Sequence, residues 1–226
     1  DLLVLTRLRP NSADAPLTIY IEGDGAAWPH PHLPPADPTP LRPVALALAD
    51  ADRSAAVAYL GRPCQYLSAE ALTRCPVDWW TTQRFSPEVL GTYQRALDGL
   101  KTKTRHPRLR LVGYSGGGVL AALLAEQRND VAQLTTIAAP LSLGAWTAWH
   151  QVSPLPEAQD PAKLSGRARI PAVHYVGSQD DIVPEPIVRA YVTMRGGDLR
   201  RVAGAGHDSG WLEFWRHIHG KESDRE

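Results

Sequence analysis

A serine surrounded by glycines is the first group in this sequence that could do covalent chemistry. Ser115 lies in the stretch RLVGYSGGG at 110–118, where an apolar run ends in Gly113-Tyr114-Ser115. A serine on a tight strand-to-helix turn takes a positive φ, and glycines two residues before and after it prevent a clash. The pattern predicts a nucleophile lifted above the end of a strand. An ordinary glycine-containing turn is the alternative.

A nucleophilic serine needs a base, and the base needs an orienting acid. His207, in the glycine-rich stretch AGAGHDSG, is the predicted base. Asp180 and Asp181 follow an apolar run, and only one of two neighbours in a turn can face His207. We predict Asp180 as the acid and Asp181 as a cap of the next turn or helix. A loop histidine and a surface turn with two carboxylates are the plain alternatives.

Two backbone N–H groups are expected to bind the negative charge that develops on a substrate carbonyl. Gly116 supplies one, at the positive end of the helix that follows the serine. The other is expected from EGDG at 22–25, with Asp24 as first choice and Gly25 as second. The alternative for this segment is a simple turn at the end of a strand.

Strands and helices alternate along most of the chain after a first hairpin, which predicts a mostly parallel sheet flanked by helices. Pro29 to Pro43 holds too many prolines for a regular element and is expected to be a long surface loop. The predicted strands are 2–8, 17–22, 55–60, 108–114, 132–138, 170–176 and 199–203. The predicted helices are 44–50, 86–103, 115–128, 185–194 and 209–219.

Taken together, the order Ser115, Asp180, His207 and the stretches GYSGG, GSQDDIVP and AGAGHDSGW resemble the α/β-hydrolase superfamily from about residue 17 to 219. The resemblance implies an eight-stranded, mostly parallel sheet, a Ser-His-Asp triad and no cofactor. Many members carry His-Gly in the oxyanion loop, whereas this chain carries Glu22-Gly23. Glu22 is expected either to hold that loop or to contact a polar group of the substrate.

The composition fits one α/β domain over residues 1–226. Lys+Arg and Asp+Glu are equal at 24 each, so neither nucleic acid nor a charged membrane surface is expected as a partner. No apolar run approaches the roughly 20 residues of a membrane-spanning helix. The chain opens at Asp1 without a starting methionine, which predicts a processed or trimmed N-terminus.

The segment 141–168 is the only room for an insert between Ser115 and Asp180, so a small lid or none is expected. Trp146 in that insert and Trp28 in the proline-rich loop are candidate pocket walls, together with Tyr114 and Gly25. Packing of loops onto the domain is an equally good account of the tryptophans. His30 and His32 lack a third ligand nearby, so no metal site is predicted.

Cys64 and Cys75 are the only cysteines, and each neighbours a proline in irregular chain that is expected to be exposed. Their positions favour a disulfide, and hence export to the periplasm or the medium, over two buried free thiols.

The predicted activity is hydrolysis of carboxylic-ester-type bonds in a small-molecule or lipid acyl substrate, through an acyl-enzyme on Ser115. A thioesterase, a serine peptidase or an acyltransferase on the same fold is an alternative. A degenerate hydrolase fold that only binds is a further one.

Overall fold

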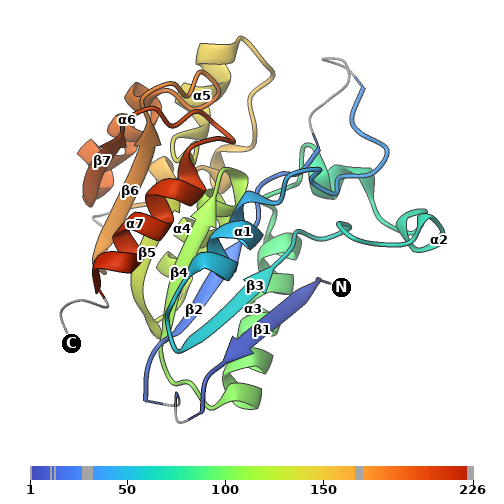
Figure 1. Ribbon diagram of the computed structural model, residues 1–226. Coiled ribbons are helices and arrows are strands. Elements are labelled where there is room, and N and C mark those ends of the chain that lie inside the picture. The colour runs from blue at the N-terminus through green and yellow to red at the C-terminus, as the bar shows by residue number, and fades with distance from the viewer. Residues whose placement is uncertain (1, 11, 13, 27–32, 166–169, 223–226) are drawn as a thin grey trace.

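A seven-stranded sheet forms the centre of the computed structural model, which describes residues 2–10, 12, 14–26, 33–165 and 170–222 (Figure 1). The strand order is β1-β3-β2-β4-β5-β6-β7, and every pair except β1 with β3 is parallel. The predicted mostly parallel sheet is confirmed, with seven described strands where the resemblance implies eight. The strands are β1 (Val4–Leu8), β2 (Leu17–Ile21), β3 (Ala56–Leu60), β4 (Leu109–Tyr114), β5 (Val131–Ile137), β6 (Ala172–Gly177) and β7 (Asp198–Val202).

The expected hairpin between the first two strands is wrong. β1 pairs with β3, whereas β2 lies between β3 and β4 in parallel register. Every residue of β2 is buried and every residue of β1 is exposed, so the more apolar strand takes the centre of the sheet and β1 the edge. The order matters for the site because β2 and β4 become direct neighbours.

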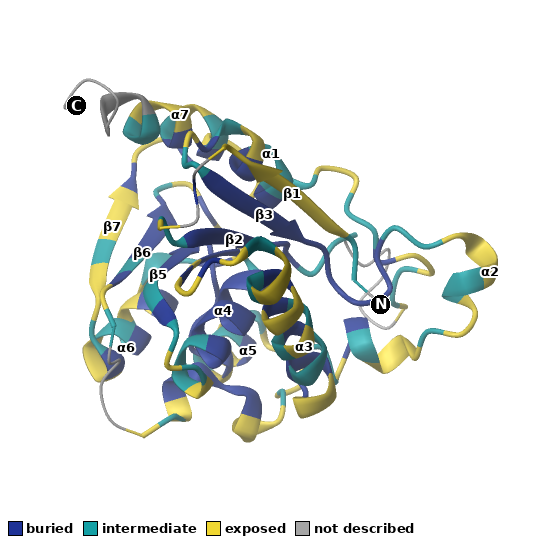
Figure 2. Cartoon of the chain, turned by 90° about the horizontal axis from the view of Figure 1, so that it is seen from below, coloured by how far each residue is buried: buried dark blue, intermediate teal, exposed yellow. Residues whose placement is uncertain are grey.

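Five helices cover the two faces of the sheet (Figure 2). One face packs on α1 (Val44–Ala51) and α7 (Trp211–Glu222), and the other packs on α3 (Pro87–Thr104), α4 (Gly116–Gln127) and α6 (Glu185–Arg195). Side chains that alternate along β2 go to opposite clusters: Ile19 and Ile21 face α3 and α4, and Tyr20 faces α1 and α7. A sheet buried on both faces explains the long apolar runs of its strands.

The two helices that flank β4 begin as their sequences predict. Ser86 accepts a hydrogen bond from the N–H of Val89, and Pro87 occupies the first helical position of α3. The next helix, α4, starts directly after Ser115 without a side-chain cap, and its residues from Gly116 to Leu124 are all buried. The N–H of Gly118 donates to the carbonyl oxygen of Ser115 at 2.9 Å, whereas none of the described residues accepts a hydrogen bond from the N–H of Gly116.

A segment that we call the arm, residues 61–85, leaves the sheet after β3 and returns at the start of α3. It carries α2 (Ala69–Leu72), which projects away from the sheet (Figure 1), and the 3₁₀ turn η1 (Val77–Trp80). Cys64 and Cys75 are joined within it with their Cα atoms 5.9 Å apart, so the predicted disulfide is confirmed. The expectation of exposed chain is wrong for Cys64, which is 1% exposed, because the base of the arm packs against the domain.

The remaining helical elements follow β5 and precede β6: α5 (Leu143–His150), η2 (Glu157–Gln159) and η3 (Pro161–Lys163). Across the parts of the chain that the structure describes, no helix has the length and apolar content to cross a membrane.

Candidate active site

The switch in strand order places the candidate site at the carboxyl edge of the sheet. From β2 the chain moves to β3 on one side and then returns to β4 on the other, so the loops after β2 and β4 emerge side by side. A crevice forms at such a point in open α/β sheets. A Cβ on Gly117 would collide with the carbonyl oxygens of Ile21 and Glu22, which shows how closely the two loops approach.

The turn after β4 has the backbone that its glycines predict. Ser115 has φ 49° and ψ −125°, a region that residues with side chains rarely occupy. A Cβ on Gly113 would collide with the carbonyl oxygen of Gly117, so the pair of glycines permits the tight turn. Gly118 packs against the side chains of Ala139 and Thr136, which explains the last glycine of the stretch.

Ser115, His207 and Asp180 form one hydrogen-bonded chain. The Oγ of Ser115 lies 3.1 Å from Nε2 of His207, and Nδ1 of His207 lies 3.1 Å from Oδ2 and 3.2 Å from Oδ1 of Asp180. With its proton on Nδ1, His207 donates to the carboxylate and its Nε2 accepts from the serine hydroxyl. The three side chains follow the carboxyl ends of β4, β6 and β7, and β5 lies between β4 and β6 in the sheet.

Asp180 both faces His207 and closes its own loop. Its Oδ1 accepts hydrogen bonds from the N–H groups of Ile182 at 3.0 Å and Val183 at 2.8 Å, and its side chain is fully buried. Asp181 is exposed. The capping role expected of Asp181 is therefore performed by Asp180, because a carboxylate has enough lone pairs to accept from two backbone N–H groups and an imidazole together.

Two aromatic side chains hold the backbone of His207 in place. The hydroxyl of Tyr114 and the indole N–H of Trp211 donate to its carbonyl oxygen at 3.0 Å and 2.8 Å. The ring of Tyr114 lies 5.5 Å from the imidazole, centroid to centroid. Burial raises the pKa of Tyr114 well above its usual range, so its hydroxyl stays a hydrogen-bond donor. Tyr114, expected in a pocket wall, is thus buried beneath the histidine.

Glu22 holds the loop after β2, which is one of the two roles expected for it. Its carboxylate accepts from the N–H groups of Gly23 at 3.0 Å, Ala45 at 3.2 Å and Leu46 at 3.3 Å, and from the hydroxyl of Tyr59 at 3.1 Å. It therefore caps α1 and fixes the loop to that helix. Burial raises the pKa of Glu22, and the four donors counteract that rise.

Asp24 and Gly116, the expected oxyanion donors, lie in contact. A Cβ on Gly116 would collide with the carboxylate of Asp24, so the side chain of Asp24 lies directly against Gly116. Among the described residues, none accepts a hydrogen bond from the backbone N–H of either one. Gly25, the second choice, has φ 97° and packs against the carbonyl of Pro38, where a Cβ would not fit.

Two arginines that sequence reasoning missed bind the carboxylate of Asp24. Nη1 of Arg62 lies 2.7 Å from Oδ1, and Nε of Arg84 lies 3.1 Å from Oδ2. Both side chains belong to the arm and are largely buried, with 3% and 13% of their surface exposed. No local pattern separates them from the other arginines of the chain, since burial of a charge depends on a partner distant in sequence.

No protein-family model matches the chain, and no curated protein matches its sequence. Solved structures do match over nearly the whole chain. An α/β serine hydrolase homologue from Coxiella burnetii is 17% identical, with a TM-score of 0.64 over 98% of this chain and 91% of the other. Est1E from Butyrivibrio proteoclasticus, solved with ferulic acid, is 14% identical, with a TM-score of 0.66 over 99% and 96% of the two chains.

The chain has the α/β-hydrolase fold. A third match, an α/β serine hydrolase described as lacking a lid, comes from Xanthomonas campestris and is 18% identical, with a TM-score of 0.63 over 99% of this chain and 88% of the other. In this α/β-hydrolase fold, the segment 141–165 that could form a lid is short, and its helix α5 is hydrogen-bonded to the loop after β6. The indole N–H of Trp146 and the ring nitrogen Nε2 of His150, both on α5, lie 2.8 Å from the carbonyl oxygen of Ile182.

The other expected pocket residues have different positions. The Trp146 ring lies 6.0 Å from the guanidinium of Arg84, and Trp149 on the same helix is 56% exposed. Trp80 is buried and donates to the carbonyl of Pro35, so it packs the arm onto the proline-rich loop. Trp28 lies outside the described residues, as do His30 and His32. Within the described ranges, no group of three or more His, Cys, Asp or Glu side chains is arranged to hold a metal ion.

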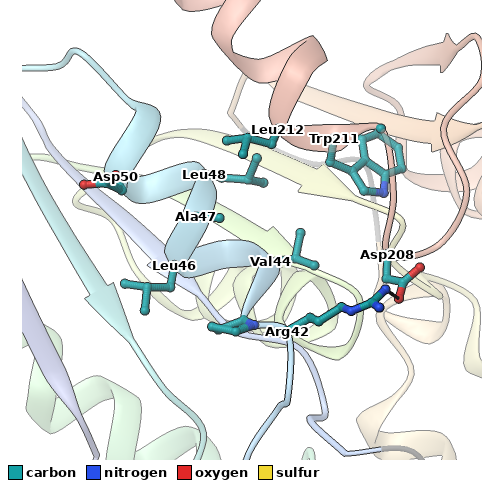
Figure 3. A pocket seen from close by; sticks show the side chains of 11 residues that line it. Arg42, Val44, Leu46, Ala47, Leu48, Asp50, Asp208, Trp211 and Leu212 are labelled. Atoms are coloured by element: carbon teal, nitrogen blue, oxygen red, sulfur yellow. Dashed lines mark ion pairs between the residues drawn. The ribbon is translucent and has the colours of Figure 1, made fainter.

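A groove of about 640 Å³ runs between α1 and α7 (Figure 3). Apolar side chains from both helices line it, and the ion pair of Arg42 with Asp208, 3.6 Å apart, lies at one end. Asp208 follows His207 directly in sequence, but the three triad side chains do not line the groove. The groove is thus a neighbour of the candidate site and not a part of it.

Proposed function

We propose that this protein is a serine hydrolase that cleaves carboxylic-ester bonds through an acyl-enzyme on Ser115. The observation that carries the proposal is the hydrogen-bonded chain from Ser115 through His207 to the buried Asp180, with contacts of 3.1 Å on both sides of the imidazole. The positive φ of Ser115 supports it, because a strained backbone at a serine is costly to keep without function. The esterases and serine hydrolases among its structural matches also support it.

In the proposed mechanism, Oγ of Ser115 attacks the acyl carbonyl carbon while Nε2 of His207 takes the hydroxyl proton. The carboxylate of Asp180 stabilises the imidazolium that forms. The N–H groups of Gly116 and Asp24 bind the negative oxygen of the tetrahedral intermediate. As the intermediate collapses, His207 donates its proton to the departing alcohol. A water that His207 deprotonates then attacks the acyl carbonyl, and His207 returns this proton to Oγ of Ser115 as the acid is released.

Replacement of the nucleophile tests this proposal directly. Ser115→Ala should lower the turnover of short p-nitrophenyl esters by roughly 10⁵-fold, because a triad without its nucleophile retains little more than binding. A fluorophosphonate probe should label the wild-type protein at Ser115 and leave the variant unlabelled.

The matched control is Ser68→Ala, which removes an exposed serine that caps α2 at the far end of the arm. It should keep full turnover. Turnover that persists in folded Ser115→Ala protein would rule out the mechanism. Absence of labelling together with absence of turnover in the wild type would favour a binding protein that has the fold without the activity.

The acyl group and the leaving group remain to be assigned. A panel of oxygen esters, acyl thioesters and peptides of matched acyl length separates an esterase from a thioesterase or a peptidase. We also propose export to the periplasm or the medium, on the strength of the Cys64–Cys75 disulfide. Recovery of two alkylatable thiols from the native protein would remove the basis of this assignment.

A further inference from the structure

The two ends of the arm meet at Asp24, next to the nucleophile. Arg62 lies at the start of the arm and Arg84 at its end, 22 residues apart. Nη2 of Arg62 donates to the backbone carbonyl of Arg84 at 2.6 Å, so the ends of the arm are joined to each other. Both guanidinium groups also lie over the ring of Phe85, 5.4 Å and 5.3 Å from its centroid. The two guanidinium groups are therefore held together beside the carboxylate of Asp24.

The carboxylate of Asp24 lies where a negative charge opposes the proposed chemistry. It contacts Gly116, whose N–H is the proposed donor to the substrate oxyanion. Its own side chain is 37% exposed. A carboxylate beside a developing oxyanion raises the energy of the transition state, unless cations neutralise it.

The pKa of Tyr114, directly before Ser115, also responds to the negative charge of Asp24. After burial, the charges of Glu22, Asp208, Asp180 and Asp24 raise its pKa further. The negative charge of Asp24 is thus felt at the residue before Ser115, and the two arm arginines place buried positive charge beside that carboxylate. Burial lowers the pKa of Arg84, and the negative charge of Asp24 counteracts that effect.

We infer that Arg62 and Arg84 are positioning residues for the oxyanion hole, which hold the Asp24 carboxylate against Gly116 and neutralise it where the oxyanion forms. This inference rests on the proposed function. It assigns the arm a role in catalysis, because the arm places two cations beside the carboxylate of Asp24 in the loop after β2. The arginines act through Asp24 and need no contact with the substrate.

A double-mutant cycle in kcat tests the inference, with kcat expressed per fluorophosphonate-titrated site so that only folded enzyme counts. Arg84→Met should lower kcat about 30-fold and change KM less than about threefold, because the unneutralised carboxylate acts on the transition state alone. In the Asp24→Asn background, the same substitution should lower kcat less than about threefold, because no charge remains to be neutralised. Arg84→Lys should recover most of the loss, since it keeps the charge.

Arg128→Met is the matched control. Arg128 also bridges carboxylates, those of Asp98 and Asp130, but it lies between α4 and β5 at the opposite edge of the sheet. It should reduce stability and leave kcat unchanged.

Three results would overturn the inference: an unchanged kcat in Arg84→Met, an equal loss in both backgrounds, or an effect confined to KM. Failure of the proposed function would look different, because turnover would then survive Ser115→Ala and no site would titrate.

Discussion

Asp180 and His207 lie on one side of Ser115, each in a short loop directly after a parallel strand. Asp24 lies on the other side. Its carboxylate is bound by two arginines of the arm, the 25-residue segment 61–85 that leaves the sheet. The first side is held by hydrogen bonds among side chains in loops that follow parallel strands. The second is held by ion pairs between segments about 40 and 60 residues apart.

The difference shows two ways to place a functional group. Where the strand ends already lie side by side, a short loop is enough, and the register of β4, β5 and β6 fixes the distances. The loop after β2 lies beside the loop after β4, and the carboxylate of its Asp24 is bound by buried charge from the arm. We expect substitutions on the triad side to abolish most of the turnover, and substitutions on the arm side to lower kcat by smaller factors.

The largest effect should come from the triad side. Asp180→Asn should lower kcat by roughly 10⁴-fold with little change in KM, because the amide favours the wrong tautomer of His207 and cannot stabilise its cation. The neighbouring Asp181→Asn should keep wild-type kcat, since that side chain is exposed. Steady-state kinetics on one p-nitrophenyl ester measure both. Equal losses in the two variants would contradict the assignment of Asp180 as the acid.

Acid should lower the free energy of unfolding through His174, a buried histidine in β6. Burial lowers the pKa of His174 to about 4, against an unfolded value near 6.5. The unfolded chain therefore binds the proton first, and the stabilisation present above pH 6.5 is lost as the pH falls through 4. Urea titrations at several pH values should show the wild type losing roughly 3 kcal/mol more than His174→Gln over that range.

The exposed His217→Gln is the control for that slope, because it removes a histidine without altering the core. A wild-type slope in the His174→Gln variant would show that another group is responsible for the acid sensitivity.

The smallest effect on turnover should come from the disulfide within the arm. Replacement of both Cys64 and Cys75 by alanine should lower the free energy of unfolding by about 2–3 kcal/mol, because the unfolded chain gains freedom. It should lower kcat only about threefold, since the arm loosens while the ion pairs at its base persist. A loss as large as that of Asp180→Asn would remove the distinction between the two sides.

Much of the fold and the nucleophile's loop could be predicted from the sequence, because those features depend on residues close together. The glycines around Ser115 encode a tight turn, and its positive φ follows from them. Ser86-Pro87 marks the start of α3 as a local signal. The apolar run of β2 marks a buried strand, although not which strands lie beside it. That missing information is why a hairpin was expected where β1 pairs with β3.

The partners of several polar groups could be identified only from the tertiary structure, because these partners are distant in the chain. Nothing near Arg62 or Arg84 in sequence indicates that they bind Asp24, and nothing near Glu22 indicates that it caps α1. Local patterns in the sequence predicted the candidate nucleophile, its candidate base and the alternation of strands and helices along the chain. The fold decided which carboxylate meets which cation, because a buried charge is stable only beside a partner that folding brings to it.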